Sequence, residues 1–377
     1  MIVLITTLHY LDDNGGGAFA SCAFINAIAA SASSTYLLYP YKEGQNLSKI
    51  NNNVKKIPVS YKKNKIFKFW DLFTGQVHRF TGIFEKKIKE INPDIVVFDN
   101  SRASFRLVDI AKRNNCKIIT IHHNYEYEYN RDNSPWYLKK LLLYWTKHYE
   151  SEAVKKSDIN LTLTSQDKIL LAEKYNNGNY DSFEVLGIFE YKNHTTNINT
   201  KINERNFPTF IITGDLSARQ TENSLVTWIK NYYPILRKYY PHSLLIVAGK
   251  RPSSFLKKIC LLKEIEIIAS PKSMQDVLSK ADIYICPVSL GGGIKLRIMD
   301  GLKNGLPILT HEVSARGYEL FLENKMLYAY KDIDTFEICL QNDFKKINKA
   351  RIIEFYEKEC SFNAGKSRFS KILNKIL

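Results

Sequence analysis

The sequence has no apolar run close to the roughly 20 residues that a membrane-spanning helix needs. Its six cysteines form no C-x-x-C pair and have no histidine at zinc-finger spacing, so they are expected to be buried thiols in a reducing cytosol. The apolar N-terminus, Met1 to Thr6, lacks a basic region before it and is followed by Asp12 and Asp13. This segment therefore indicates a first β-strand and not a signal peptide. These absences predict a cytoplasmic protein that is at most attached to a membrane surface.

Acidic residues are also scarce, since 38 Asp and Glu stand against 54 Lys and Arg, which gives a formal net charge of +16. Such an excess is typical of proteins with a polyanionic partner: nucleic acid, an anionic membrane face or a phosphate-bearing substrate. The length of 377 residues suits about two domains. Apolar residues make up 45% of the chain and charged residues 24%, which is close to the average of globular proteins. This composition excludes wholesale disorder and a collagen-like or coiled-coil rod.

Short β-branched runs alternate with longer helical patterns along the chain. Strands are expected at 2–6, 35–38, 94–98, 117–121, 158–163, 210–213, 243–248, 264–268, 282–286 and 306–310. Helices are expected at 18–30, 76–91, 103–113, 137–156, 222–239, 273–280 and 294–303. Apolar strands separated by helices indicate βαβ units with right-handed connections, and therefore parallel sheets covered on both faces.

The alternation is interrupted once, by a segment rich in Asn, Thr and Lys at Glu190–Pro208. The predicted fold class is therefore α/β, with two tandem Rossmann-like domains facing a cleft. The predicted boundaries are 1–190 for the first domain, 191–208 for a linker, 209–360 for the second domain and 361–377 for a final helix. Doubly wound sheets bind ligands at their carboxyl edges, so the ligand sites are expected there.

Three glycines, at residues 15–17, follow the first strand and precede a helix. Glycines let the backbone approach a ligand closely, and a helix N-terminus favours anions. Gly16 and Gly17 are therefore candidate donor-binding residues. The pattern is not G-x-G-x-x-G, so a dinucleotide site is only weakly indicated, and a flexible loop remains the alternative.

A second glycine run stands in a strand, turn and helix pattern at 283–300. Gly292 and Gly293 would expose N–H groups to a diphosphate at a helix N-terminus, and Lys295 would reach the same phosphates. Asp300 would accept hydrogen bonds from two ribose hydroxyls. A solvated lysine beside a glycine turn is the alternative interpretation.

This segment resembles the nucleotide-sugar-binding segment of retaining glycosyltransferases with the GT-B fold, of the group-1 (GT4-like) family. The match includes Gly291 to Lys295, Asp300, and the run from Gly305 through Pro307 to Thr310. A second match lies upstream, from Thr213-Gly214 to Pro252. The resemblance is specific over about residues 209–317 and only topological over the first half.

The resemblance implies a metal-independent enzyme without a cofactor, whose donor is a nucleoside-diphosphate sugar, most simply a UDP-sugar. It assigns the charge on the leaving diphosphate to Arg219 and Lys295, and it places His122 near the donor sugar as a catalytic residue. A strand-end histidine satisfied by the backbone is the alternative for His122. It implies further donor contacts, carried by Gly214, Lys250, Gly293, Ile294 and Asp300. It also implies that the final helix crosses back to the first domain.

The chain departs from the family pattern at two positions. Where many members have a Glu-x7-Glu pair, this sequence has Gly292 and Asp300. The residue that contacts the sugar hydroxyls is therefore not identified by the motif, and the shorter Asp300 side chain is expected to weaken the ribose contact.

Asp332 and Asp334 form a D-x-D pattern, which holds a divalent metal in glycosyltransferases of the other major fold. Here an apolar run follows, so capping of a helix N-terminus explains the pattern better than a metal site does. The motifs G-x-S-x-G and H-E-x-x-H are absent. A retaining transfer by front-face substitution does not need such a nucleophile, because the protein positions the substrates and stabilises charge.

Half of the net positive charge falls between Lys42 and Ile91, where twelve Lys and Arg stand against four Asp and Glu. Aromatic residues are interleaved there, and again between Trp136 and Trp145. This combination suits the surface of an anionic membrane. It also suits single-stranded nucleic acid, although no nucleic-acid-binding motif supports that reading, and a core-packed helix with solvated lysines remains an alternative.

The sequence therefore predicts a retaining glycosyltransferase for polysaccharide or glycoconjugate synthesis, cytoplasmic or peripheral on the inner face of the cell membrane. Its acceptor would be a glycan or a lipid-linked glycan. The alternatives are a GT-B nucleotide-sugar epimerase, a non-catalytic GT-B partner subunit and a nucleic-acid-binding module.

Overall fold

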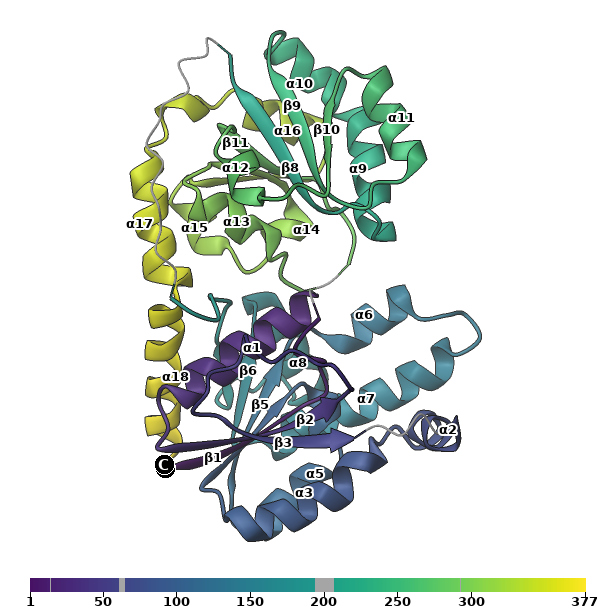
Figure 1. Ribbon diagram of the computed structural model, residues 1–377, viewed down its shortest axis with the longest axis vertical. Helices are drawn as coiled ribbons and strands as arrows, with labels where there is room; N and C mark the ends of the chain where they lie inside the picture. The colour runs from purple at the N-terminus through teal and green to yellow at the C-terminus, as the bar shows by residue number, and fades with distance from the viewer. Residues whose placement is uncertain (14, 61–64, 194–206, 292) are drawn as a thin grey trace. The chain divides into compact units, whose positions relative to one another are not determined.

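The computed structural model describes residues 1–13, 15–60, 65–193, 207–291 and 293–377. The chain divides into two compact units, of which unit 1 comprises 1–193 with 360–377 and unit 2 comprises 194–359. Each unit contains one parallel β-sheet with helices around it (Figure 1). The predicted α/β class with two Rossmann-like sheets is confirmed. Most of the predicted linker at 191–208 lies outside the described residues, and the predicted boundaries stay predictions.

Unit 1 has a seven-stranded sheet in the order β3-β2-β1-β4-β5-β6-β7. Its strands are β1 (Ile2–Thr7), β2 (Ser34–Tyr41), β3 (Lys55–Ser60), β4 (Ile95–Asp99), β5 (Lys117–His122), β6 (Ile159–Thr162) and β7 (Phe183–Val185). From β1 the chain adds β2 and β3 on one side and then β4 to β7 on the other, so the direction of strand addition reverses at β1. Strand β1 pairs in parallel with both β2 and β4. The carboxyl ends of β1, β4 and β5 therefore meet at one edge, where doubly wound folds bind ligands.

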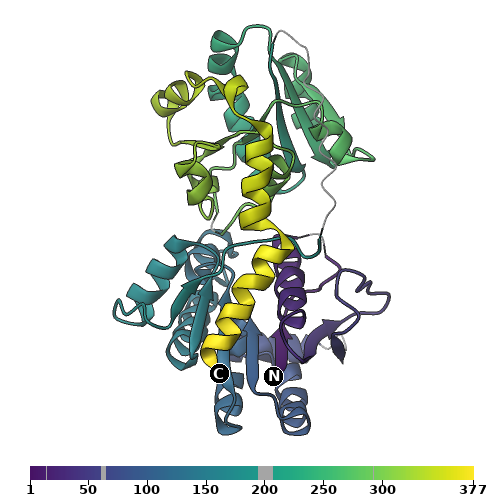
Figure 2. The same ribbon diagram turned by 90° about the vertical axis from the view of Figure 1, so that its left-hand side faces the viewer.

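The helices of unit 1 are α1 (Gly16–Ala29), α2 (Lys65–Thr74), α3 (His78–Ile91), α4 (Ser101–Ser104), α5 (Leu107–Arg113), α6 (Glu126–Asn133), α7 (Lys139–Lys156), α8 (Ser165–Tyr175) and α18 (Phe362–Ile376). Helix α3 illustrates how the sequence pattern produces the packing. Phe80, Phe84 and Ile88 recur every four residues, so they form one stripe that is buried against the sheet. Helix α18 lies beside α1 (Figure 2), where Phe369 contacts Phe24.

Unit 2 has a six-stranded parallel sheet in the order β10-β9-β8-β11-β12-β13. Its strands are β8 (Thr209–Asp215), β9 (Leu244–Lys250), β10 (Glu266–Ala269), β11 (Ile283–Cys286), β12 (Ile308–His311) and β13 (Leu327–Tyr330). Its helices are α9 (Arg219–Asn231), α10 (Tyr233–Tyr239), α11 (Ser254–Leu262), α12 (Met274–Leu278), α13 (Arg297–Lys303), α14 (Glu312–Ala315), α15 (Glu319–Glu323), α16 (Ile333–Leu340), the 3₁₀ helix η1 (Phe344–Lys346) and α17 (Lys349–Cys360). The core is centred on Trp228, which packs edge-on against Phe336.

Three predicted helices differ from the structure, and the one expected at 222–239 is divided at Tyr232 into α9 and α10. The helix expected at 103–113 is split into α4 and α5, because Arg106 has a φ of 62°, which α-helical backbone does not allow. The helix expected at 294–303 begins later, at Arg297, so Lys295 lies in the turn before α13. Strands β3, β7 and β13 were not predicted.

All six cysteines are among the described residues, and each is buried with a free thiol, as predicted. Within the same residues, no helix has both the length and the apolar character needed to cross a bilayer.

Candidate functional site

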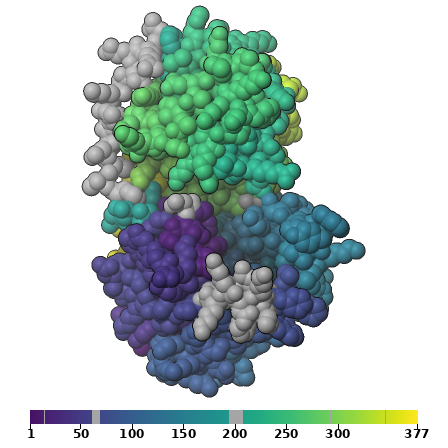
Figure 3. Space-filling model, turned by 45° about the vertical axis from the view of Figure 1, so that its right-hand side comes forward, coloured from purple at the N-terminus to yellow at the C-terminus, as the bar shows by residue number. Residues whose placement is uncertain are grey.

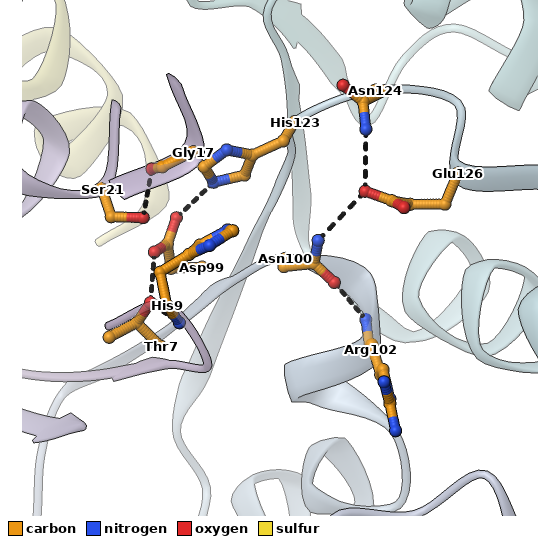
Figure 4. Close-up of polar contacts among 10 residues, drawn as sticks. All are labelled: Thr7, His9, Gly17, Ser21, Asp99, Asn100, Arg102, His123, Asn124 and Glu126. Atoms are coloured by element: carbon orange, nitrogen blue, oxygen red, sulfur yellow. Dashed lines mark hydrogen bonds and ion pairs between the residues drawn. The ribbon is translucent and has the colours of Figure 1, made fainter. Parts of the chain in front are cut away.

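An ion pair between a histidine and an aspartate lies at the carboxyl edge of the unit 1 sheet (Figure 4). Asp99 ends β4 and His123 directly follows β5, and the two strands are neighbours. The distance from His123 Nε2 to Asp99 Oδ1 is 2.6 Å, and the Thr7 hydroxyl donates to the other carboxylate oxygen at 2.6 Å. Asp99 is 1% exposed, so the pair is held away from water.

The pKa values indicate which of these groups carry charge. Burial alone would raise the pKa of Asp99, but the His123 charge and hydrogen bond outweigh it and lower the value to about 2. Burial alone would lower the pKa of His123, but Asp99 outweighs it and raises the value. Asp99 is therefore an anion, and it favours the protonated form of His123.

His9 follows β1 and packs against His123, with the ring centroids 5.0 Å apart and the rings tilted by 43°. Burial, and next the nearby His123 charge, lower the pKa of His9 to about 4. Of the two neighbouring histidines, His9 is therefore the neutral one. Gly17 lies against the His9 ring, and the Ser21 hydroxyl donates to the Gly17 carbonyl at 2.9 Å. The predicted donor-binding Gly17 is thus part of this cluster, and Gly16 is the first residue of α1.

His122, the histidine predicted to be catalytic, points to the other side of the strand end. It is 1% exposed, and its Nε2 lies 3.0 Å from Asn160 Oδ1 inside the sheet. Burial lowers its pKa to about 4. Adjacent residues of a strand face opposite sides, so only His123 enters the polar cluster. The catalytic role of His122 stays a prediction, and the geometry favours His123 instead.

A second polar group adjoins this cluster (Figure 4). Glu126 Oε1 accepts hydrogen bonds from the side-chain amides of Asn100 at 3.2 Å and Asn124 at 2.9 Å. Asn100 has a φ of 108°, and its Oδ1 caps α4 by accepting from the Arg102 N–H. Burial raises the pKa of Glu126. The edge of the sheet thus presents amide, carboxyl and imidazole groups, which are the usual hydrogen-bonding partners of sugar hydroxyls.

In unit 2 the carbonyls of Gly291 and Gly293, after β11, lie around the Lys295 side chain, and we call this segment the glycine turn. The Lys295 ammonium donates to the carbonyls of Gly291 at 3.2 Å and Gly293 at 3.3 Å. The Lys295 carbonyl accepts from the Tyr318 hydroxyl at 3.1 Å, which fixes the turn from the other side. Gly291 has a φ of 86° and Gly293 a φ of 69°, a backbone region that favours glycine. Gly292 lies outside the described residues.

Arg297, the first residue of α13, reaches across the end of β8. Its guanidinium donates to the Thr221 hydroxyl at 3.1 Å and to the Thr213 carbonyl at 3.4 Å. A Cβ on Gly214 would lie 2.7 Å from Arg297 Nη1, and Gly214 has a φ of 153°. The predicted Gly214 thus makes room for an arginine that the sequence-based site did not include.

The other predicted residues of unit 2 lie on elements that end or begin at the same carboxyl edge. Arg219 is the exposed first residue of α9, and Lys250 is the exposed last residue of β9. Ile294 precedes Lys295 in the turn, and Asp300 is exposed on α13. The structure brings the side chain of Lys295 to the glycine turn. Among the contacts described for this part of the chain, none joins Lys295 to Arg219. The roles of all these residues stay predictions.

Asp332 has a structural role. Its carboxylate accepts from the Thr335 N–H at 2.9 Å, and the Thr335 hydroxyl accepts from the Asp332 N–H at 3.1 Å. This reciprocal pair caps α16, which confirms the predicted N-cap. Within the described residues, no group of three or more His, Cys, Asp or Glu side chains is arranged to hold a metal ion.

Comparison with known protein families identifies part of unit 2. Residues 207–341 match the family described as glycosyl transferases group 1. This stretch contains the glycine turn, Lys295 and Arg297. No curated protein sequence matches the chain.

Solved structures match over the whole chain. A glycosyltransferase from Rickettsia africae has a TM-score of 0.69 at 14% identity, with 100% of this chain and 98% of that chain covered. The lipopolysaccharide outer core galactosyltransferase WaaB, in its apo form, has a TM-score of 0.69 at 14% identity, with 100% and 99% covered. Anabaena HepE in complex with UDP-glucose has a TM-score of 0.64 at 10% identity, with both chains fully covered. At these identities the likeness shows the fold, which is that of GT-B glycosyltransferases.

Proposed function

Because residues 207–341 form a group 1 glycosyltransferase domain and the chain has the GT-B fold, we propose that this protein transfers a sugar from a nucleoside-diphosphate sugar to an acceptor, with retention at the anomeric carbon. The match over 207–341, which includes the Lys295 turn, carries this proposal. The acceptor class that we propose is a glycan or a lipid-linked glycan, as used in polysaccharide or glycoconjugate synthesis.

The proposed donor site is the carboxyl edge of the unit 2 sheet. Backbone groups of the glycine turn, together with Lys295 and Arg297, would hold the diphosphate, and Arg219 and Lys250 would add positive charge. Asp300 would hold the ribose hydroxyls. A uracil base is the simplest choice, since HepE, which has the same fold, was solved in complexes with UDP and with UDP-glucose.

The proposed reaction is a front-face substitution. The bond from the anomeric carbon to the diphosphate oxygen breaks, and the acceptor oxygen bonds to the same face of that carbon. The acceptor proton passes to the leaving phosphate oxygen. The protein then has two tasks, which are to position the substrates and to stabilise the negative charge that grows on the diphosphate. Lys295 and Arg297 suit the second task because both are cations fixed by backbone carbonyls.

For unit 1 we propose binding of the sugar and the acceptor by the polar cluster of His123, Asp99 and Glu126. His123 is the stronger candidate of the two adjacent histidines, since Asp99 fixes its ring and its charge. The excess of basic and aromatic residues in the N-terminal half supports attachment to the inner, anionic face of a membrane, where a lipid-linked acceptor would lie. We propose that the enzyme acts in the cytoplasm, where nucleotide sugars are made.

The experiment that tests this function compares Lys295→Ala with Lys230→Ala, a control at the exposed C-terminal end of α9. Loss of a charged hydrogen bond to phosphate should weaken UDP binding by about 10- to 100-fold for Lys295→Ala and leave Lys230→Ala unchanged. Isothermal titration with UDP and a thermal-shift screen of UDP-, GDP-, ADP- and CDP-sugars measure this directly. Unchanged binding in Lys295→Ala would mean that the donor site lies elsewhere.

Product analysis separates the proposal from its alternatives. Transfer to an acceptor, insensitive to EDTA, supports the glycosyltransferase. Interconversion of free nucleotide sugars without any acceptor would point to an epimerase. Absence of both nucleotide binding and donor hydrolysis would point to a non-catalytic subunit.

A further inference from the structure

An unusual number of large aromatic side chains are exposed on one part of unit 1. They stand on α2 and on the α6–α7 connection with the first turns of α7, and we call them the aromatic face: Phe69, Trp70, Phe73, Trp136, Tyr137 and Tyr144. Trp136 is 87% exposed, and Phe69 and Phe73 are 61% and 60% exposed. Contiguous apolar surface of this kind is rare on a monomer unless it binds something.

The two segments of the aromatic face are joined by a tight contact, although about 70 residues separate them in the sequence. Gly75 directly follows α2 and has a φ of 71°, and a Cβ there would lie 2.6 Å from Cδ2 of Trp145. Trp145 is half-buried in α7 and packs edge-on against Tyr144, with the ring centroids 5.1 Å apart. Figures 1 and 3 show α2 and the α6–α7 segment as neighbours at the edge of unit 1. The aromatic side chains therefore belong to one surface.

Among the side chains described for α2, the rings of Phe69, Trp70 and Phe73 contact one another, and each is at least half exposed. Phe69 stacks on Phe73 at 6.0 Å with an angle of 15° between the rings, and Trp70 packs edge-on to Phe69 at 6.4 Å. Positions 69 and 73 are one helical turn apart, so both rings emerge on the same side of the helix. These three rings therefore form an exposed aromatic side of α2.

The charge around the aromatic face is positive. Helix α2 and the first half of α7, residues 65–74 and 139–148, contain five lysines and one aspartate. The aspartate, Asp71, is paired with His78, whose backbone N–H and Nδ1 both lie 3.0 Å from its Oδ1. Lys140 and Lys147 are exposed on α7. On α6, the carboxylates of Glu128 and Asp132 are both bonded to Arg131.

We propose that the aromatic face docks unit 1 on the surface of an anionic lipid bilayer. Tryptophan and tyrosine are enriched at the level of the lipid headgroups, and lysines beside them are attracted to anionic lipids while their stems cover apolar surface. Protein–protein interfaces, in contrast, are depleted of lysine, which disfavours a second copy of this chain as the occupant. This inference depends on the proposed function in one respect: the benefit of docking would be access to a lipid-linked acceptor.

Binding of the full-length chain to vesicles tests this proposal. Co-sedimentation with phosphatidylglycerol-containing vesicles at low salt should exceed that with pure phosphatidylcholine vesicles by about tenfold or more, and high salt should reduce it. Trp70→Ala combined with Trp136→Ala should lower vesicle binding by about tenfold or more, because two interfacial anchors are lost. Phe255→Ala, which removes a 58% exposed aromatic ring from α11 of unit 2, is the matched control and should bind as the wild type does.

Fluorescence of the wild-type protein provides a measurement that needs no variant. Insertion of Trp70 and Trp136 should shift the emission to the blue, and lipids with brominated acyl chains should quench it. Absence of binding to anionic vesicles, or equal binding by the double variant, would overturn the proposal. So would a concentration-dependent dimer, or a tight complex with RNA, that forms through these tryptophans without any lipid binding.

The UDP titration in solution keeps this inference separate from the proposed function. A protein that binds UDP but not vesicles would refute the aromatic face and the proposed membrane attachment, but not the sugar transfer. A protein that binds vesicles but no nucleotide would refute the glycosyltransferase alone.

Discussion

The imidazole of His9 occupies the space that a side chain at residue 17 would need. A Cβ on Gly17 would lie 2.6 Å from His9 Cε1 and 3.1 Å from both ring nitrogens. His9 cannot retreat easily, because its ring also packs against His123, which Asp99 holds. The glycine after the first strand is thus needed by the protein's own polar cluster, whether or not a ligand approaches it.

Gly17→Ala should therefore displace His9 and lower the free energy of unfolding by about 1–3 kcal/mol, the usual cost of overpacking. Gly15→Ala is the matched control, since a Cβ there meets nothing within 4 Å. Thermal and urea unfolding of the two variants measure the difference. Equal stability of both would show that His9 moves aside at no cost.

Asp99→Asn should change the pH dependence of activity. Asp99 raises the pKa of His123, so in the wild type the imidazolium persists above the usual value of 6.5 and is lost as the pH rises through the raised pKa. Without the carboxylate, this loss should begin at lower pH, and the alkaline limb of kcat/KM should move in the same direction.

The control for Asp99→Asn is Asp109→Asn, which removes a surface ion pair with Lys156. A histidine titration by NMR gives a second measurement if activity is too low. An alkaline limb that stays in place, with activity reduced equally at every pH, would assign Asp99 a purely structural role.

His122 should make the fold sensitive to acid. Its folded pKa of about 4 lies below its ordinary value of 6.5, so the unfolded chain binds a proton that the folded chain refuses. Stability should fall as the pH drops from 6.5 towards 4, by on the order of 3 kcal/mol at most from this residue. His9 shifts in the same direction and adds to the loss.

His122→Gln should flatten this acid dependence in urea unfolding curves, whereas His148→Gln, at an exposed position on α7, should not. The slope with pH is the decisive quantity, because the substitution also alters the contact with Asn160. A slope that matches the wild type would show that His122 is not protonated on unfolding in this range.

Asp332→Ala should lower stability by about 1 kcal/mol through loss of the helix cap on α16. Asp334→Ala, in the first turn of the same helix, should have a smaller effect because its carboxylate is not the capping group. Neither substitution should change the response of activity to EDTA. An equal loss of EDTA-sensitive activity in both variants would restore the metal interpretation of the D-x-D pattern.

The sequence predicts the fold well, because burial on both faces of a parallel sheet leaves a strong signal. The run Ile95 to Phe98 is apolar without interruption and forms the central strand β4. Short edge strands have no such signal: β7 has three residues and carries the exposed Val185. The break at Arg106 is also hidden, since it depends on a single left-handed residue that is not glycine.

The site was harder to predict than the fold. The pair His122-His123 identifies a strand end, but which imidazole faces the polar edge depends on the position of the last strand residue, and a shift by one residue exchanges them. Arg297 stands in the motif two residues after Lys295. Its position depends on the absence of a side chain at Gly214, which is 83 residues away in the chain. The buried pair of Asp99 and His123 has no sequence pattern, because its partners come from different strands.

Helix α18 has a consequence for the order in which the protein folds during synthesis. Phe369 is fully buried against Phe24 and Phe189, and the Arg368 guanidinium donates to the Leu186 carbonyl at 2.6 Å. The ribosome makes all of unit 2 before it makes this helix. Until α18 is made, Phe24 and Phe189 lack their contacts with Phe369. Unit 1 therefore begins synthesis first but can complete its fold only after unit 2 has been made.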